Sequence, residues 1–263
     1  MPSAKKYTVI TGASQGLGKA FAECCAKRGQ NLLLVSLPSE GIFELEQLLK
    51  QKFGVDIYSF ELDLTNSKAL NQFIESVQKF SINSLINNAG MGGTKAFHEA
   101  TKDDIDKIIL LNMRSLVLLT HQLLPKLKQE KSASILNISS LAAFVPMPYK
   151  TVYPASKAFV YSFSRGLQKE LKKTNVHVAV AHPGGMATNP EVSKRIQLYK
   201  GLIKRSILTV EKTAEICLEG LDRKERVIIP GRINQISSFF QRVLPDSIQM
   251  NLIYSKIQKE LSQ

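Results

Sequence analysis

The chain of 263 residues has few cysteines, no tryptophan and fewer acidic than basic residues. Its three cysteines, Cys24, Cys25 and Cys217, are too few and too unevenly spaced for a disulfide framework. No zinc-ligand spacing surrounds them. Such sparse, unpaired thiols are typical of a reducing compartment. The sequence therefore predicts a cytoplasmic protein without a metal site.

Long apolar runs are also missing. The first residues lead from Met-Pro-Ser-Ala-Lys-Lys directly into a strand pattern, without the apolar core or cleavage site of a signal peptide. The most apolar long stretch, 105–124, contains Asp106, Lys107, Asn112, Arg114 and His121. A spanning helix rarely carries so many polar groups. We expect a buried or interface helix there and no transmembrane segment.

The charge is unbalanced, with 35 basic against 22 acidic residues and a net charge of +13. Such a field attracts anions, including nucleic acid, acidic lipid surfaces, phosphorylated cofactors and acidic carrier proteins. No basic motif with interleaved aromatics supports nucleic-acid binding, so we expect no nucleic-acid partner. The hydrophobic content of 44% excludes a mainly disordered chain.

Apolar segments of strand length alternate with segments of helical periodicity. The expected strands are 7–11, 31–36, 56–62, 84–87, 134–138, 176–181 and 227–229. The expected helices are 16–28, 42–52, 67–80, 103–127, 153–172 and 210–221. Regular β-α-β alternation with right-handed crossovers predicts an α/β, doubly wound Rossmann fold with helices on both faces of a parallel sheet.

We expect a single domain over residues 1–263, with a helical C-terminal extension over 231–263. One apolar stripe of the extension ends at Pro245 and comprises Ile233, Ile236, Phe239, Phe240, Val243 and Leu244. A second amphipathic segment follows Asp246. The stripe favours packing on the domain itself or on a partner subunit, with peripheral membrane contact as the alternative.

A glycine-rich turn, Thr11-Gly12-Ala13-Ser14-Gln15-Gly16-Leu17-Gly18, lies between the first expected strand and helix. Glycines let the backbone turn tightly and approach a pyrophosphate, which the N–H groups and dipole of the following helix then bind. This context indicates a dinucleotide site. The alternative at this point is a glycine-rich turn without a ligand.

Further motifs follow in a characteristic order. They are Asn87-Asn88-Ala89-Gly90, then Asn112, then Ser140 with Tyr153-x-x-x-Lys157, and finally Pro183-Gly184 with Thr188. With them the chain, over about residues 5 to 230, resembles the short-chain dehydrogenases/reductases, and among these the 3-oxoacyl reductase-like branch. The resemblance implies hydride transfer between a nicotinamide cofactor and a ketone or secondary alcohol.

The resemblance implies catalytic roles for Asn112, Ser140, Tyr153 and Lys157. Tyr153 and Lys157 are four residues apart and share a helix face, and a neighbouring ammonium lowers the pKa of a phenol. The phenol then exchanges a proton with a carbonyl oxygen. In the family, Ser140 hydrogen-bonds the substrate oxygen and Asn112 holds a water that links Lys157 to solvent. Because Pro154 follows it, Tyr153 is expected at or just before the helix start.

A cofactor site is implied in the same way. Its expected residues are Gly12, Ser14, Gln15, Gly16, Leu17, Gly18, Ser36, Asp63, Leu64, Asn88, Ala89, Gly90, Tyr153, Lys157, Pro183, Gly184, Met186 and Thr188. The family places Asp63 near the adenine, Asn88 near the adenosine ribose, and Met186 and Thr188 near the nicotinamide. A capping or loop acid is the alternative for Asp63.

The end of the second strand bears on the choice of cofactor. Ser36 stands where an acid would hold the ribose 2′-OH of NAD and repel a 2′-phosphate, and Leu37 and Gln15 stand where a basic residue would favour NADP. A serine hydroxyl can donate to a phosphate. The sequence favours NADP(H), with NAD(H) as the alternative.

The segment after Thr188 bears on the substrate. Between Glu191 and Glu211 it has no acid and five basic residues: Lys194, Arg195, Lys200, Lys204 and Arg205. One interpretation is a solvated lid; the other is contact with an acyl-CoA or an acidic acyl carrier protein. Its apolar residues could line a tunnel for an acyl chain or another lipid ketone.

The resemblance implies a homodimer or homotetramer formed through helices 103–127 and 153–172. A non-catalytic dinucleotide-binding sensor or scaffold is the alternative to an enzyme, because one fold hosts both kinds of function. Ser140, Tyr153 and Lys157 argue against it, since a sensor does not need them.

Overall fold

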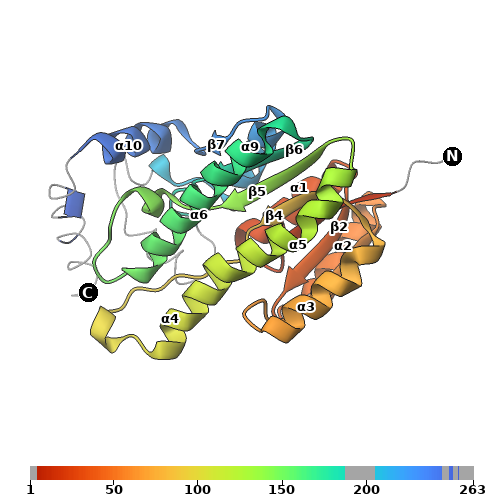
Figure 1. Cartoon of the computed structure of the whole chain (residues 1–263), viewed down its shortest axis with the longest axis horizontal. Coiled ribbons are helices and arrows are strands. Elements are labelled where there is room, and N and C mark those ends of the chain that lie inside the picture. Colours follow the sequence, from red (N-terminus) through yellow and green to blue (C-terminus); the bar gives the residue numbers. More distant parts are fainter. Residues whose placement is uncertain (1–4, 187–204, 245–248, 251–253, 255–263) are drawn as a thin grey trace.

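The computed structural model describes residues 5–186, 205–244, 249–250 and 254. Its sheet contains β1 (Lys6–Thr11), β2 (Asn31–Ser36), β3 (Ile57–Glu61), β4 (Ser81–Asn87), β5 (Ala133–Ile138), β6 (Val176–Ala181) and β7 (Val227–Ile228). The strand order is β3-β2-β1-β4-β5-β6-β7, and all neighbours are parallel (Figure 1). The predicted doubly wound fold is confirmed.

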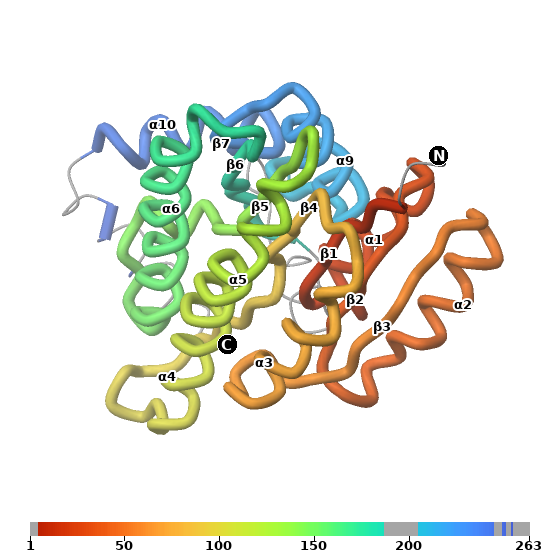
Figure 2. Tube along the Cα trace, turned by 45° about the vertical axis from the view of Figure 1, so that its right-hand side comes forward, coloured from red at the N-terminus to blue at the C-terminus, as the bar shows by residue number. Residues whose placement is uncertain are grey.

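Helices cover both faces of the sheet (Figure 2). One face is covered by α1 (Gly16–Lys27), α2 (Ile42–Phe53) and α9 (Val210–Asp222), and the other mainly by α3 (Ser67–Ser76), α5 (Leu116–Gln129) and α6 (Val152–Glu170). Successive strand side chains point to opposite faces, so Ile10 packs in the first core and Val9 in the second. Both faces are buried, which is why the strands are continuous apolar runs.

The long helix predicted at 103–127 contains an irregular turn. A capping box between Thr101 and Asp104 starts α4 (Lys102–Ile109), and a π-helical turn, Leu110–Ser115, joins it to α5. Such turns are rare and occur frequently at functional sites. By length and composition alone Lys102–Gln129 could also cross a membrane, a test that core helices of soluble proteins pass too. Its α5 part packs against β4 and β5.

The described part of the C-terminal extension forms α10 (Arg232–Val243), after Gly231 with φ of 92°. Its buried residues are Asn234 and Ser238. The apolar stripe predicted for this helix faces outward instead: its side chains from Ile236 onward are exposed, whereas Ile233 is partly buried. Most of the second predicted segment, after Asp246, lies outside the described residues.

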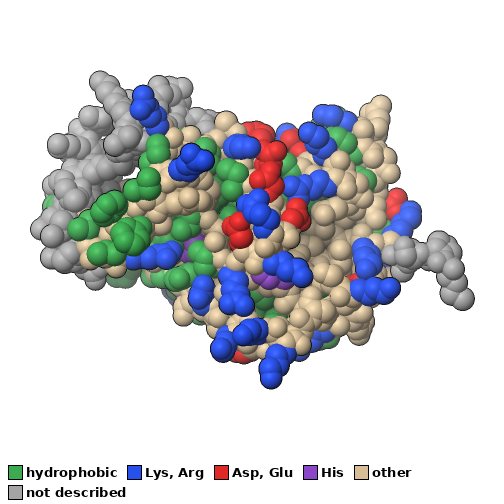
Figure 3. Space-filling model, turned by 90° about the horizontal axis from the view of Figure 1, so that it is seen from above, with side chains coloured by type: hydrophobic (Ala, Val, Ile, Leu, Met, Phe, Trp, Pro, Cys, Tyr) green, Lys and Arg blue, Asp and Glu red, His purple; other side chains and the backbone are tan. Residues whose placement is uncertain are grey.

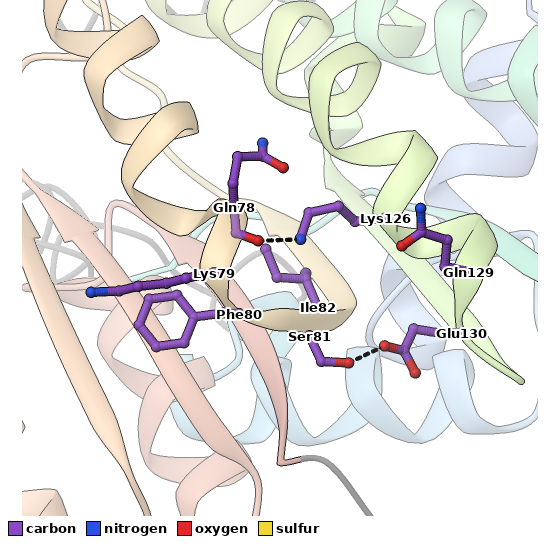
Figure 4. A pocket seen from close by; sticks show the side chains of 8 residues that line it. All are labelled: Gln78, Lys79, Phe80, Ser81, Ile82, Lys126, Gln129 and Glu130. Carbon is purple, nitrogen blue, oxygen red and sulfur yellow. Dashed lines mark hydrogen bonds between the residues drawn. The ribbon is translucent and has the colours of Figure 1, made fainter.

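The predicted site residues lie at one end of the strands. Those outside helices follow the carboxyl ends of β1 to β6, and Asn112, Tyr153 and Lys157 come from the π-helical turn and α6. A pocket at the opposite end, where β4 begins, is lined by residues 78–82 together with Lys126, Gln129 and Glu130 (Figure 4). There the Lys126 amine donates to the carbonyl of Gln78, and Ser81 donates to Glu130. None of the predicted site residues lines this pocket.

Candidate active site

The glycine-rich turn after β1 is shaped by two close approaches. Gly12 has φ of 65°, and a Cβ added to it would lie 3.0 Å from the Cα of Ala89. A Cβ on Gly18 would lie 1.8 Å from the carbonyl oxygen of Gly12. Larger residues at either position would force the turn apart, so the backbone here needs glycine.

The N-terminus of α1 fits a bound pyrophosphate. Gln15 is its N-cap residue and makes no side-chain cap, and the first turn has no acidic residue. The first-turn N–H groups of a helix have no partner within the helix, and the dipole favours negative charge there. Together with the glycine cradle, this end of α1 is built to hold the phosphates of a dinucleotide.

Asn88, after β4, ties the glycine-rich turn to the neighbouring strand. Its side-chain amide donates to the carbonyls of Thr11 and Gly12 at 2.9 and 3.1 Å. The Thr11 hydroxyl in turn accepts from the backbone N–H groups of Asn88 and Ala89. β1 and β4 are neighbours at the switch point of the strand order, where doubly wound sheets bind ligands.

The adenosine end of the expected site has an acid that the sequence analysis did not weigh. The hydroxyl of Ser14 donates to the carboxylate of Glu40 at 2.5 Å. Ser36, predicted to contact a phosphate, is buried, and its hydroxyl donates to the carbonyl of Leu37. Asp63 is exposed and accepts from the backbone N–H of Thr65. Leu64, beside it, is buried in the core.

Tyr153 and Ser140 meet although they come from different elements. Tyr153 lies in the first turn of α6, where proline at the next position is tolerated, and its side chain lies close enough to that of Ser140 to interact with it. Burial raises the pKa of Tyr153, and the Ser140 hydroxyl opposes that shift. The adjacent Ser139 points elsewhere, because its hydroxyl donates to the carbonyl of Lys157.

Lys157 is buried beneath Tyr153. Its amine donates to the carbonyl of Ile138 at 3.0 Å and lies 5.8 Å from the centre of the Tyr153 ring. Burial lowers the pKa of Lys157 to about 8. The expected lowering of the Tyr153 pKa by Lys157 is not seen, because desolvation of the phenol dominates and the amine is directed at Ile138.

Asn112 lies in the π-helical turn beside Lys157. A Cβ added to Gly90 would lie 3.1 Å from both the Asn112 side-chain oxygen and the Lys157 amine. A Cβ on Gly92 would lie 2.9 Å from the Tyr153 ring. The backbone therefore passes directly over the side chains of Asn112, Lys157 and Tyr153, and positions 90 and 92 have no room for a Cβ.

The turn after β6 completes the described site. The carbonyl of Pro183 accepts from the backbone N–H of Leu141, next to Ser140, and Gly184 lies against Asn234 of α10. Met186 is partly buried against the core. Thr188 and the basic residues 194–204 lie outside the described residues.

Known proteins share this arrangement. The family described as short chain dehydrogenase matches residues 6–198. The chain belongs to this family.

Individual relatives support the assignment of this short chain dehydrogenase. Very-long-chain 3-oxoacyl-CoA reductase from Bos taurus is 32% identical over 194 residues, which are 72% of this chain but only 62% of that protein. The bulky-bulky ketone specific alcohol dehydrogenase from Comamonas testosteroni is 31% identical, with a TM-score of 0.76 over 98% of this chain and 94% of its own. A short-chain dehydrogenase from Sphingobium yanoikuyae in complex with NADPH is 29% identical, with a TM-score of 0.77 over 98% and 96%.

Sequence reasoning missed several residues that support the site of this dehydrogenase. The Ser156 hydroxyl accepts from the Asn112 amide at 2.9 Å and donates to the carbonyl of Tyr153. Behind it runs a buried polar network in which Asn87 donates to Thr120 and Asn137, and Asn137 donates to Ser164. The available signal was the asparagines inside apolar strand runs, since buried amides need partners.

His182 was also missed. Its Nδ1 lies 3.0 Å from the carbonyl oxygen of Ser140, and its ring packs against those of Phe144 and Tyr161. Burial lowers the pKa of His182 to about 4. A neutral imidazole therefore supports the backbone of Ser140 from behind.

Proposed function

We propose that the protein reduces a ketone or 3-oxoacyl group on an apolar substrate to a secondary alcohol, with NADPH as the preferred cofactor. The observation that carries the proposal is the buried Tyr153 next to Ser140. Its raised pKa keeps the phenol protonated, and a protonated phenol is a proton donor. Reduction of a carbonyl needs such a donor at the oxygen.

The side chains divide the work around the carbonyl. A nicotinamide cofactor, when bound, would supply the hydride that the carbonyl carbon needs. The Tyr153 hydroxyl gives its proton to the carbonyl oxygen, so a secondary alcohol forms. The Ser140 hydroxyl donates a hydrogen bond to the same oxygen and stabilises its developing negative charge.

Lys157 and Asn112 support this step from below Tyr153. With a pKa of about 8, Lys157 can exchange protons near neutral pH and replace the one that Tyr153 gives up. Asn112 and Ser156 fix the turn of backbone that covers Lys157. In the family the Asn112 position also holds a water that leads to solvent.

The preference for NADPH rests on charge at the adenosine end. Ser36 leaves the end of β2 without the acid that would repel a 2′-phosphate, and the net charge of the chain is +13. The relative from Sphingobium yanoikuyae binds NADPH. Glu40 opposes this preference, because its carboxylate accepts from Ser14 of the glycine-rich turn. We expect Glu40 to weaken the selectivity without reversing it.

We base the substrate class on the relatives and on the sequence of the segment after Thr188. The Bos taurus relative is named for very-long-chain 3-oxoacyl-CoA, and the Comamonas testosteroni relative for bulky ketones. An acyl-CoA also suits the basic residues between Glu191 and Glu211. A small-molecule substrate with a long or bulky apolar part is the common element.

We also propose that the protein is a homo-oligomer in the cytoplasm. On α6 the rings of Phe159 and Phe163 stack near the α5 face and are only partly buried, which suits a homo-oligomer through α5 and α6. The cysteines are free, and burial raises the pKa of Cys25 to about 12, so this thiol is inert. These features suit a cytoplasmic enzyme.

The first experiment is a fluorescence titration of the purified chain with NADPH and with NADH. Consumption of the better cofactor is then followed with 3-oxoacyl-CoA thioesters of increasing chain length and with bulky apolar ketones. We expect tighter binding of NADPH and a rate that rises with the apolar size of the substrate. Binding of neither cofactor, or the same background rate with every carbonyl, would contradict the proposal.

A further inference from the structure

The helix α10 has its polar and apolar faces reversed relative to a packed surface helix. Asn234 and Ser238 point into the domain. The outward side, which we call the α10 face, carries Ile236, Phe239, Phe240 and Val243, with 59%, 63%, 53% and 65% of each residue exposed. A helix on a soluble domain normally turns its apolar stripe inward.

This orientation is fixed near the start of the helix. The Asn234 amide donates to the carbonyl of Ser206, a distant part of the chain, at 3.1 Å, and to the nearby carbonyl of Pro230 at 2.8 Å. Turning the apolar side inward would break the buried hydrogen bond to Ser206, so the exposed face is a stable feature of the fold.

The surroundings of the α10 face are basic. Between Glu225 and Asp246 the chain has three arginines and no acid. Arg232 and Arg242 are exposed at the two ends of the helix, and Arg242 also lies 4.2 Å from the centre of the Phe144 ring. Figure 3 shows hydrophobic side chains gathered at the α10 end of the molecule with Lys and Arg beside them, while acidic side chains lie nearer the middle.

From this combination we propose that the α10 face binds the surface of an anionic lipid membrane. Exposed phenylalanines next to aliphatic side chains enter the boundary between headgroups and acyl chains, and Arg232, exposed at the start of the helix, pairs with lipid phosphates. The helix lies flat on such a surface and does not span it. Its 12 residues make it about 18 Å long.

A second copy of the chain fits this face less well. A twofold contact would oppose the same patch on both copies and bring Arg232 and Arg242 of each toward the other, with no acid between residues 226 and 245 to balance them. One face of a short helix also supplies only part of the about 800 Å² per partner that a stable interface buries. An anionic lipid surface removes both objections.

The location of α10 gives the binding a consequence for the site. Asn234 contacts Gly184 after β6, and Arg242 contacts Phe144, which follows Ser140. Both contacts border the residues that surround Tyr153. A membrane held on the α10 face therefore lies one helix away from the candidate active site. This consequence rests on the proposed function, whereas the lipid binding itself does not.

The test is co-sedimentation of the full chain with vesicles of phosphatidylcholine alone and of phosphatidylcholine mixed with phosphatidylglycerol. We expect binding to the mixed vesicles that weakens with added salt. The double variant Phe239→Ser/Phe240→Ser should bind at least about tenfold more weakly, because two buried aromatic side chains are lost. Phe43→Ser on α2, where the phenylalanine is 49% exposed, should bind like the wild type.

Two further variants are used. One tests the contribution of charge, and the other replaces the double variant if that variant does not fold. Arg232→Glu should reduce binding to the mixed vesicles and make the remaining binding less sensitive to salt, with all apolar residues retained. Cofactor titration and thermal melting check that each variant is folded. If the double variant does not fold, Ile236→Ser takes its place.

Three results would overturn the inference. The wild type could fail to bind either kind of vesicle, or the double variant could bind as tightly as the wild type. The double variant could also show a lower molar mass than the wild type in light scattering, which would assign the α10 face to self-association. The assay contains neither cofactor nor substrate, so its failure leaves the proposed reaction untouched.

Discussion

The side-chain amide of Asn112 pairs with both backbone groups of Met91. Its oxygen accepts from the Met91 N–H at 2.9 Å, and its nitrogen donates to the Met91 carbonyl at 2.8 Å. The same nitrogen donates to Ser156. One amide in a π-helical turn thus joins the segment after β4 to α6, and it places the backbone of Gly90 to Gly92 over Lys157 and Tyr153.

Replacing Asn112 tests this link. Asn112→Ala leaves two backbone groups of Met91 without partners, which should lower the free energy of unfolding by about 1–3 kcal/mol. Turnover should fall as well, because the segment over Lys157 is released. Urea denaturation and steady-state kinetics measure both. Asn71→Ala, on the exposed side of α3, is the matched control. Unchanged stability and turnover in Asn112→Ala would show that the pairing with Met91 is dispensable.

Tyr153→Phe removes the proton donor and keeps the ring. We expect the turnover number to fall by about 10²- to 10⁴-fold, the usual size of a general-acid contribution. Cofactor affinity should change little, since the glycine-rich turn and α1 are untouched. Tyr58→Phe on β3, which is 44% exposed, controls for loss of a phenol. Retained turnover in Tyr153→Phe would assign the proton transfer to another group.

Replacing Lys157 should abolish activity and at the same time raise stability, because its buried amine carries a folding cost. Its pKa falls from 10.5 in the unfolded chain to about 8 in the folded one. The unfolded state therefore binds more protons between these values, and this residue makes stability rise with pH from about 8 to 10.5. Below pH 8 the buried charge costs up to about 3 kcal/mol, because each tenfold loss of proton affinity corresponds to about 1.4 kcal/mol.

Lys157→Met removes that cost together with the catalytic amine. At pH 7 the variant should be inactive yet more stable than the wild type, and the stability difference should shrink between pH 8 and 10.5. Urea titrations across that range measure the difference, with Lys172→Met at an exposed position as the control. A less stable variant, or a difference that does not depend on pH, would contradict a buried charge at Lys157.

Glu40 should limit the selectivity for NADPH. Glu40→Gln removes a negative charge beside Ser14 and should tighten NADPH binding by about fivefold, or about 1 kcal/mol for one charge pair near water. NADH binding should stay the same, because NADH lacks the 2′-phosphate. Fluorescence titration compares both cofactors, with Glu75→Gln on the exposed side of α3 as a control for net charge. Equal changes for both cofactors would place Glu40 away from the phosphate.

The sequence alone determined the fold and the motif positions. Apolar runs that suit strands buried on both faces, alternating with helical periods, leave a parallel doubly wound sheet as the simple solution. The predicted strand 31–36 agrees with β2, and 176–181 agrees with β6. The glycines of the turn after β1 were also predictable, because positive φ and close backbone approach leave no room for a Cβ.

Only the tertiary structure decided which residues are neighbours and which side chains are buried. The apolar pattern did not predict the π-helical turn at Asn112, because a single widened turn barely changes the periodicity of a long helix. The direction of the Tyr153 pKa shift depended on burial, which local spacing to Lys157 does not reveal. The apolar face of α10 points outward because the Asn234 side chain on the opposite face donates hydrogen bonds to the carbonyls of Ser206 and Pro230. Pattern gives the faces of a helix, but only the fold decides which face is buried.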